Sequence, residues 1–324
     1  MRMRPLRILT WHVHGSYLEY LSSVRHEFFV PVRPGRPPGY VGLPPGRAWG
    51  PNLHEVSAEH VHELDVDVVV YQSHANWLQD RWQLLSPTQR ALPSVAIEHD
   101  PPRRSPTETR HPVDDPNVLL VHVTHFNRLM WDSGSTPSVV IEHGVSVPAG
   151  VVWSGELPSG ICVVNGIARR ERRVGPDVLE QARREVPIDL YGMFSEELGG
   201  LGEVPMPELA KVERRYRFFF NPIRWTSLGL AVCEAMAIGL PIVGLATTGM
   251  VGVVQDDVSG YLDNDVDALV ERMRELIEDR DLAARLSEGA RRTAIERFSI
   301  ERFVRDWEQA LADVTARPRG RAAA

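Results

Sequence analysis

A single carboxylate, Glu234, stands in an otherwise apolar segment that reads TSLGLAVCEAMAIGLP from 226 to 241. The Gly229–Leu230 turn precedes a predicted helix, whose first backbone N–H groups have no helical partners and can bind a diphosphate together with the positive end of the dipole. From one turn further along, Glu234 can accept hydrogen bonds from two ribose hydroxyls. The segment therefore predicts a nucleotide site. The alternative is an ordinary helix glutamate in a salt bridge.

A group of arginines follows the first predicted strand of the second half, in GIARRERRVG (166–175). A guanidinium presents a planar fork of donors that suits phosphate oxygens. Arg169 and Arg173 are the phosphate ligands that we predict, and Arg173 is preferred because it is nearer to Gly175. The alternative for each arginine is the solvated, charged start of a helix.

The composition favours a packed soluble protein with two domains. The chain has 324 residues, of which 43% are hydrophobic and 24% charged, and its net charge of −7 gives no general attraction to nucleic acid. The two cysteines stand in apolar runs, which is typical of reduced, buried thiols. No signal peptide and no stretch of 18 apolar residues is found, so we expect a cytoplasmic protein without a transmembrane segment.

Short apolar runs alternate with helical segments in both halves, which predicts parallel βαβ units. We expect a first domain over 1–150, a second over 151–314 that includes the terminal helices, and a disordered tail over 315–324. Strands are predicted in these runs: 7–13, 26–32, 66–72, 93–99, 117–125, 137–145, 160–167, 187–193, 216–222 and 241–248. Two segments rich in Pro, Gly and Arg, 32–51 and 99–112, are predicted to be long loops.

Residues 216–262 resemble the donor-binding domain of glycosyltransferase family 4. The hallmark of that family is Pro, three residues, Glu-Gly-Phe-Gly-Leu, and then Glu-Ala-Met-Ala-x-Gly-x-Pro. Here it stands as Pro222, IRW, TSLGLAVC and EAMAIGLP, followed by IVGLATTGMVGVV. The second half of the motif matches well, whereas the first glutamate is replaced by Thr226, which can form a hydrogen bond but carries no charge.

The resemblance implies an α/β protein with the GT-B fold, in which two Rossmann-like, doubly wound domains face each other across a cleft. It implies a retaining, metal-independent hexosyltransferase that uses a nucleotide-sugar donor, UDP- or GDP-linked, and no cofactor. The leaving phosphate helps to accept the acceptor proton in this family's proposed mechanism. The acceptor is left open as a small molecule, a glycan or a lipid-linked molecule, and nucleic acid is not expected.

The same resemblance implies roles for individual residues. Glu234 binds the ribose, and Thr226, Thr248 and Gly249 contact the donor, the last two from the 247–250 loop. His99 ends a predicted strand, SVAIEHD, and faces the donor sugar as the predicted catalytic residue. On the acceptor side, HGSY (14–17) matches a glycine-rich turn: Gly15 allows close backbone approach, and Ser16 could cap the following helix.

Two other classes of protein remain as alternatives. The HVH pairs at 12–14 and 60–62 resemble the metal ligands of hydrolase barrels, although every histidine lies in the first half and no barrel pattern is present. A non-catalytic nucleotide-sugar-binding protein on the same fold is the second alternative, and Thr226 is its best support. The acidic groups at 65–67 and 263–267 are explained by solvated loops and helix caps rather than by a metal.

Overall fold

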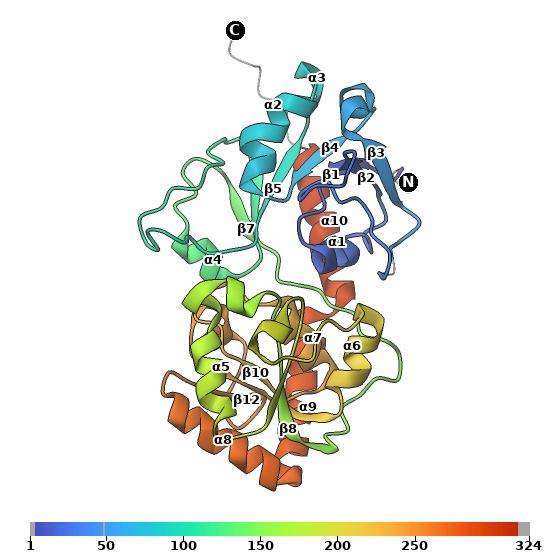
Figure 1. The fold of residues 1–324 in the computed structure, drawn as a ribbon. Helices are drawn as coiled ribbons and strands as arrows, with labels where there is room; N and C mark the ends of the chain where they lie inside the picture. The colour runs from blue at the N-terminus through green and yellow to red at the C-terminus, as the bar shows by residue number, and fades with distance from the viewer. Residues whose placement is uncertain (1–3, 48, 317–324) are drawn as a thin grey trace. The chain divides into compact units, whose positions relative to one another are not determined.

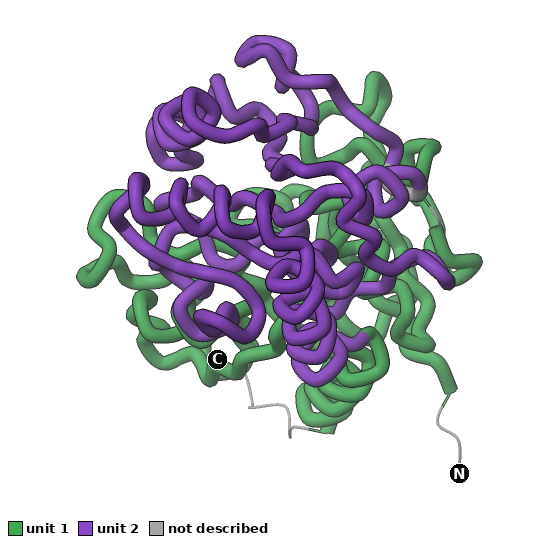
Figure 2. Tube along the Cα trace, turned by 90° about the horizontal axis from the view of Figure 1, so that it is seen from below, with its two compact units in different colours: residues 1–143, 300–324 green, residues 144–299 purple. Residues whose placement is uncertain are grey.

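The computed structural model describes residues 4–47 and 49–316. The chain divides into two compact units (Figure 2). The first unit contains residues 1–143 and 300–324, and the second contains residues 144–299. Each unit is built around one parallel sheet with helices (Figure 1).

The first unit has a seven-stranded sheet with the order β3-β2-β1-β4-β5-β6-β7, and every pair of neighbours is parallel. Its strands are β1 (Arg7–Thr10), β2 (Glu27–Val32), β3 (Leu53–Ser57), β4 (Val68–Tyr71), β5 (Ser94–Glu98), β6 (Val118–His122) and β7 (Ser138–Val140). The central strands β4, β5 and β6 are buried throughout, as their largely apolar runs predict. The chain order reverses between β1 and β4, and this switch point is where doubly wound sheets bind ligands.

The helices of the first unit are α1 (Gly15–Leu21), α2 (Arg81–Leu84), α3 (Pro87–Arg90), α4 (His125–Met130) and α10 (Ile300–Ala316). A π-helical turn over Asn76–Asp80 leads into α2. The last helix, α10, was expected in the second domain but clusters with the first unit. It buries Phe303 against Tyr17, with ring centroids 5.7 Å apart, and Arg302 donates a hydrogen bond to the carbonyl of Glu142 at 2.8 Å.

The second unit has a five-stranded parallel sheet with the order β12-β11-β10-β8-β9. Its strands are β8 (Leu157–Val163), β9 (Ile188–Tyr191), β10 (Tyr216–Asn221), β11 (Ile242–Leu245) and β12 (Gly260–Asp263). Its helices are α5 (Pro176–Arg183), α6 (Met206–Glu213), α7 (Leu230–Ile238), α8 (Val266–Glu278) and α9 (Arg280–Phe298). The chain order reverses between β8 and β10.

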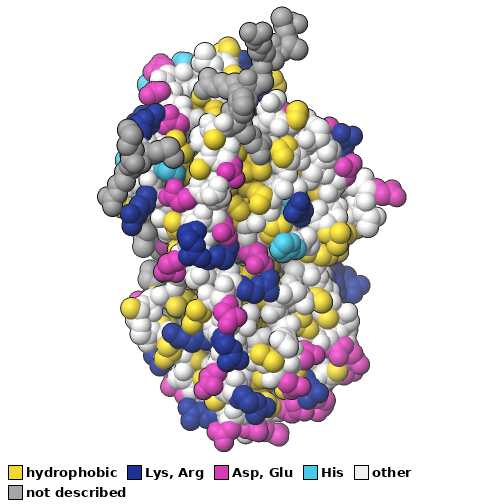
Figure 3. Space-filling model, turned by 180° about the vertical axis from the view of Figure 1, so that it is seen from behind, with side chains coloured by type: hydrophobic (Ala, Val, Ile, Leu, Met, Phe, Trp, Pro, Cys, Tyr) yellow, Lys and Arg dark blue, Asp and Glu magenta, His cyan; other side chains and the backbone are white. Residues whose placement is uncertain are grey.

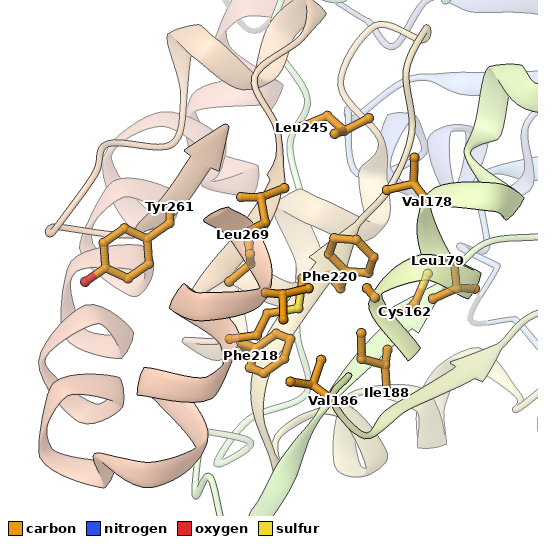
Figure 4. Close-up of a cluster of buried hydrophobic side chains, with 14 of the residues drawn as sticks. Cys162, Val178, Leu179, Val186, Ile188, Phe218, Phe220, Leu245, Tyr261 and Leu269 are labelled. Atoms are coloured by element: carbon orange, nitrogen blue, oxygen red, sulfur yellow. The ribbon is translucent and has the colours of Figure 1, made fainter. Parts of the chain in front are cut away.

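The core of the second unit gathers around the central strand β10. Phe218 and Phe220 are fully buried, and Ile188 of β9 and Leu269 of α8 belong to the same cluster (Figure 4). The Cys162 thiol is buried there as well, and burial raises its pKa to about 12. Burial therefore holds β10 in place, and the loop that leads from β10 to α7 begins at a well-packed strand.

Among the elements absent from the sequence prediction are the strands β3 and β12 and the helices α3, α4 and α6. β3 reads LHEVS and alternates between buried and less buried positions. The predicted loop 32–51 has within its described residues an isolated bridge between Val32 and Val41 and no strand of its own. Of the predicted tail, 317–324 lies outside the described residues, and α10 extends to Ala316. Among the described helices, none combines the length and the apolar character that are needed to cross a membrane.

Candidate functional site

The second unit presents the start of α7 at the carboxyl end of β10. Gly229 is the N-cap residue, with φ −67° and ψ 138°, and no side chain caps the helix. The amide of Val232 donates a hydrogen bond to the Gly229 carbonyl at 3.1 Å and so completes the first turn of the helix. The amides of Leu230 and Ala231 come earlier in the chain and take no part in the helical hydrogen bonds. A Cβ atom placed on Gly229 would meet no atom within 4 Å. The helix start therefore faces open space, as a phosphate site requires.

The loop after β11 is bonded to the loop before α7. The Thr248 hydroxyl and the Gly249 amide both donate hydrogen bonds to the carbonyl of Ser227, each at 3.1 Å. Thr248 has φ 50°, a left-handed conformation that β-branched residues rarely adopt and that tends to occur at ligand sites. The predicted donor residues at 226–230 and 247–250 thus form one structural patch.

Glu234 lies on α7 and is 8% exposed. A second carboxylate, Glu213 at the end of α6, is 2% exposed, and its Oε1 has no hydrogen-bond partner. Burial raises the pKa of Glu213 well above its ordinary value, and the charge of Glu234 raises it further. Burial thus favours the neutral form of Glu213. No local sequence signal marks Glu213 as buried, because it stands among charged residues in PELAKVERR.

The two predicted arginines have different surroundings. Arg173 donates from Nη1 to the carbonyl of Trp225 at 3.2 Å, and its own carbonyl accepts hydrogen bonds from the amides of Arg224 and Trp225 at 2.9 and 3.2 Å. Arg173 is thereby placed beside the loop that leads to α7. Arg169, in contrast, is hydrogen-bonded to Glu197 and stacks on Phe194, with 3.6 Å between its guanidinium carbon and the ring centroid.

The first unit contains a cavity of about 560 Å³ at the carboxyl ends of β1, β4 and β5. His14, Gln72, His74, Glu98 and His99 are among the residues that line it. Nε2 of His99 lies 3.1 Å from Oε1 of Gln72, and since an amide oxygen only accepts, Nε2 carries the proton. Burial lowers the pKa of His99 well below its ordinary value, and His14 contributes to the same effect. His99 is thus a neutral imidazole at the cavity.

The predicted acceptor-side residues Gly15 and Ser16 lie at the start of α1, beside Arg47 from the long loop. Arg47 donates to the Ser16 hydroxyl and to Glu19, both at 3.1 Å. A Cβ atom on Gly15 would lie 2.8 Å from Nε of Arg47. The capping role predicted for Ser16 is wrong, because His14 is the N-cap residue and Ser16 accepts from Arg47 instead. The abundance of arginine in 32–51 was the only sequence signal for this contact.

A second polar group at the cavity joins two histidines through one carboxylate. Oε2 of Glu98 lies 2.6 Å from Nε2 of His74 and 3.0 Å from Nε2 of His111. Burial acts to raise the pKa of Glu98, but the hydrogen bonds from His111 and His74 outweigh it and hold the pKa at about 2. Within the described residues, this is the only histidine and carboxylate group whose ligand atoms converge as a metal site would require. Neither HVH segment contributes to it.

Known structures define the fold class. Sucrose-phosphate synthase from Thermosynechococcus elongatus matches 97% of this chain and 100% of its own, with a TM-score of 0.70 at 15% identity. Anabaena Alr3699/HepE in complex with UDP and glucose matches 95% of this chain and 100% of its own, with a TM-score of 0.66 at 13% identity. Two parallel α/β sheets in this arrangement are the GT-B fold of glycosyltransferases, as the resemblance implied.

Sequence comparison identifies the domain more closely. Residues 193–293 match the family model "Glycosyl transferases group 1", so the second unit carries a domain of this type. N-acetyl-alpha-D-glucosaminyl L-malate synthase of Bacillus anthracis is 33% identical over 90 residues, which are 27% of this chain and 24% of that protein. D-inositol 3-phosphate glycosyltransferase of Salinispora arenicola is 42% identical over 80 residues, 24% and 18% of the two chains. The chain thus spans a quarter or less of these two relatives.

Proposed function

We propose that the protein is a retaining, metal-independent glycosyltransferase that moves a sugar from a nucleoside diphosphate to an acceptor hydroxyl. The observation that carries this proposal is the uncapped start of α7 at Gly229, with Arg173 beside its loop and the 247–250 loop bonded to Ser227. A group 1 glycosyltransferase domain over 193–293 supports it, because that range contains the helix start, Glu234 and the 247–250 loop.

The proposed donor site uses each feature for one part of the nucleotide sugar. The diphosphate binds the amides after Gly229 together with Arg173, and Glu234 accepts hydrogen bonds from the ribose. The sugar contacts Thr226 and the 247–250 loop, and His99 is the proposed catalytic residue. Catalysis then depends on positioning the two substrates and on stabilising the charge of the leaving diphosphate. We propose a UDP- or GDP-sugar as the donor, and one structure of the same fold contains UDP.

A thermal-shift panel tests this proposal directly. UDP, GDP, ADP and TDP and their sugar conjugates are added to the full chain, with and without a chelator. A ligand at a hundredfold its dissociation constant adds about 2.7 kcal/mol of apparent stability. We expect one nucleotide family to raise the melting temperature equally in both buffers. A shift that vanishes with the chelator would contradict metal independence, and no shift at all would contradict the donor site.

Retention is tested separately, once the donor is known. The anomeric configuration of the transferred sugar in the product is read by NMR, and inversion would overturn this part of the proposal.

A non-catalytic nucleotide-sugar-binding protein is the second candidate, and the specific observation that favours it is Thr226 in place of a glutamate. This candidate predicts a thermal shift without release of nucleoside diphosphate under any condition.

Figure 3 shows basic and acidic side chains interspersed on one face of the molecule. Nucleic-acid binding commonly uses a basic stripe, so the visible face gives no support to a nucleic-acid partner.

A further inference from the structure

Phe194 is an exposed aromatic residue in the loop that follows β9 in the second unit. It is 49% exposed, and two other large apolar residues of the same loop, Met193 and Leu201, are also exposed. A single exposed apolar residue on a protein surface is common, whereas several from one loop are typical of a binding surface. The loop after β9 is therefore a candidate for contact with a ligand.

The backbone of Phe194 adopts a conformation that favours glycine. Its φ of 60° and ψ of 21° lie in the left-handed region, which bulky residues rarely occupy. The amide of Ser195 donates a hydrogen bond to the Gly192 carbonyl at 3.1 Å, which closes this turn. Residues in such conformations tend to occur at ligand sites. An aromatic ring at a position where glycine would fit better is thus a second indication of a ligand.

Arg169 covers one side of the Phe194 ring. Its guanidinium carbon lies 3.6 Å from the ring centroid, and its Nε donates a hydrogen bond to Oε1 of Glu197 at 2.9 Å. A guanidinium over an aromatic face is an attractive contact that orients the ring. About half of Phe194 is exposed with Arg169 in place, so the ring is accessible to a planar ligand from its other side.

The loop after β9 lies at the same edge of the sheet as the start of α7. β9 ends at Tyr191 and β10 at Asn221, and β8 lies between these two parallel strands. Neighbouring strands are about 4.8 Å apart, so the two carboxyl ends are separated by about 10 Å. An extended nucleoside diphosphate spans a distance of this order from its phosphates to its base. A nucleotide with its diphosphate at the start of α7 can therefore reach the loop after β9.

The arginine-rich segment 166–175 joins these two parts of the second unit. At one end, the amide of Gly166 donates a hydrogen bond to the Met193 carbonyl at 2.7 Å. At the other end, the carbonyl of Arg173 accepts a hydrogen bond from the amide of Trp225 at 3.2 Å, in the loop that leads to α7. The loop after β9 and the proposed phosphate site thus belong to one hydrogen-bonded set of loops.

We propose that Phe194 stacks on the nucleobase of the donor, and this inference rests on the proposed glycosyltransferase function. The base lies on the side of the ring opposite to Arg169, while the diphosphate lies at the start of α7. Stacking on an aromatic side chain suits every base, because each base has a π face, and it corresponds to about 5- to 150-fold in affinity. Phe194 therefore contributes affinity for a nucleotide without selecting one base.

The test removes the ring with Phe194→Gly, which suits the left-handed backbone. UDP and GDP are titrated calorimetrically into the full chain. We expect the affinity for the nucleotide that binds to fall by about 5- to 150-fold, with a melting temperature no lower than that of the wild type. Trp82→Ala is the matched control, because Trp82 is an exposed aromatic residue of the first unit with an exposure of 61%, and it should bind nucleotide as the wild type does.

Two further variants separate stacking from apolar packing. Phe194→Trp keeps an aromatic face and should retain the affinity of the wild type. Phe194→Leu keeps an apolar side chain without a π face and should lose affinity as Phe194→Gly does. Wild-type affinity in Phe194→Gly or in Phe194→Leu would overturn the proposal.

Inorganic pyrophosphate separates contact with the base from contact with the phosphates. It carries no base, so Phe194→Gly should bind it as tightly as the wild type does, whereas Gly229→Ala should bind both pyrophosphate and nucleotide more weakly. An equal loss of affinity for pyrophosphate and nucleotide in Phe194→Gly would overturn the stacking role, because the loop would then act on the phosphate site.

The contact is also measurable directly by NMR. In protein with ¹³C-labelled phenylalanine, the ring protons of Phe194 should show nuclear Overhauser effects to the base protons of the bound nucleotide, with the assignment made from the signal lost in Phe194→Gly. The absence of these effects in the saturated complex would overturn the inference. Failure of the proposed function has a different signature, because no nucleotide would then bind to the wild-type chain.

Discussion

The carbonyl of Ser227 accepts a hydrogen bond from the amide of Gly249 at 3.1 Å, and a Cβ atom on Gly249 would lie only 2.8 Å from the same oxygen. This close approach joins the loop after β11 to the loop before α7. Two segments of the chain that carry the predicted donor residues are thus joined at one carbonyl oxygen, which also accepts a hydrogen bond from the Thr248 hydroxyl.

Gly229 and Gly249 should respond differently to the same substitution. Gly229→Ala fits the backbone and meets no neighbour, so we expect an unchanged melting temperature but at least about tenfold weaker nucleotide binding, because the methyl group narrows the phosphate site. Gly249→Ala should cost about 1–3 kcal/mol of stability through its clash with Ser227. Melting curves and calorimetric titration of nucleotide check both. Full nucleotide affinity in Gly229→Ala would contradict the phosphate site.

Removing the carboxylate of α7 should affect binding more than folding. A hydrogen bond to a charged group contributes about 1.5–3 kcal/mol, so Glu234→Ala should weaken nucleotide binding by roughly 10- to 100-fold. Glu271→Ala is a suitable control, because Glu271 is an exposed glutamate of the same unit with a side-chain exposure of 67%. Titration with the nucleoside diphosphate measures both variants. Equal affinities in the two would contradict the ribose role of Glu234.

Arg169 and Arg173 form a matched pair of variants for testing the proposed phosphate site. We expect Arg173→Ala to reduce nucleotide affinity by about tenfold or more, because Arg173 is hydrogen-bonded to the loop that leads to α7. Arg169→Ala should retain the affinity, since its guanidinium is bound to Glu197 and stacked on Phe194. Titrations at low and high salt check this. A larger loss of nucleotide affinity in Arg169→Ala than in Arg173→Ala would indicate instead that Arg169 is the phosphate ligand.

Glu98 makes the stability of the protein dependent on pH. Its pKa is about 2 in the folded chain, against 4.5 for an unperturbed glutamate, so its contribution is fully present above about pH 4.5 and is lost as the pH falls toward 2. The difference corresponds to a contribution on the order of 3 kcal/mol at neutral pH.

Urea unfolding of the wild type and Glu98→Gln over this range measures that contribution. We expect the variant to be less stable at pH 7 and the gap to close as the pH falls below 4.5. His122 contributes in the same direction, since burial lowers its pKa to about 4. The charge of Glu98 raises that pKa, so Glu98→Gln also enlarges the His122 contribution at acid pH. A gap that stays constant with pH would contradict the ionised state of Glu98.

The positions of most strands and the donor motif could be predicted from the sequence. Strands β4, β5 and β6 are buried on both faces, so most of their residues are apolar and their positions follow largely from composition. The run from 226 to 241 likewise predicts a helix with an open start, because a Gly-Leu turn, small residues and a Gly-Leu-Pro end are local signals. β3 was not predicted because LHEVS is short and half polar. Its parallel hydrogen bonds to β2 hold it as a strand despite this weak sequence signal.

The sequence by itself therefore determined two βαβ halves, an uncapped helix start after Gly229 and buried thiols, because each of these depends on residues close together in the chain. Only the tertiary structure decided which side chains meet. Glu98 is 24 residues from His74 and 13 from His111, and the fold of the first unit brings all three together. It also decided that α10 joins the first unit through Phe303 and Arg302. A hydrogen bond or ring contact between distant residues leaves no periodic signal in the sequence, so the folded sheet alone reveals it.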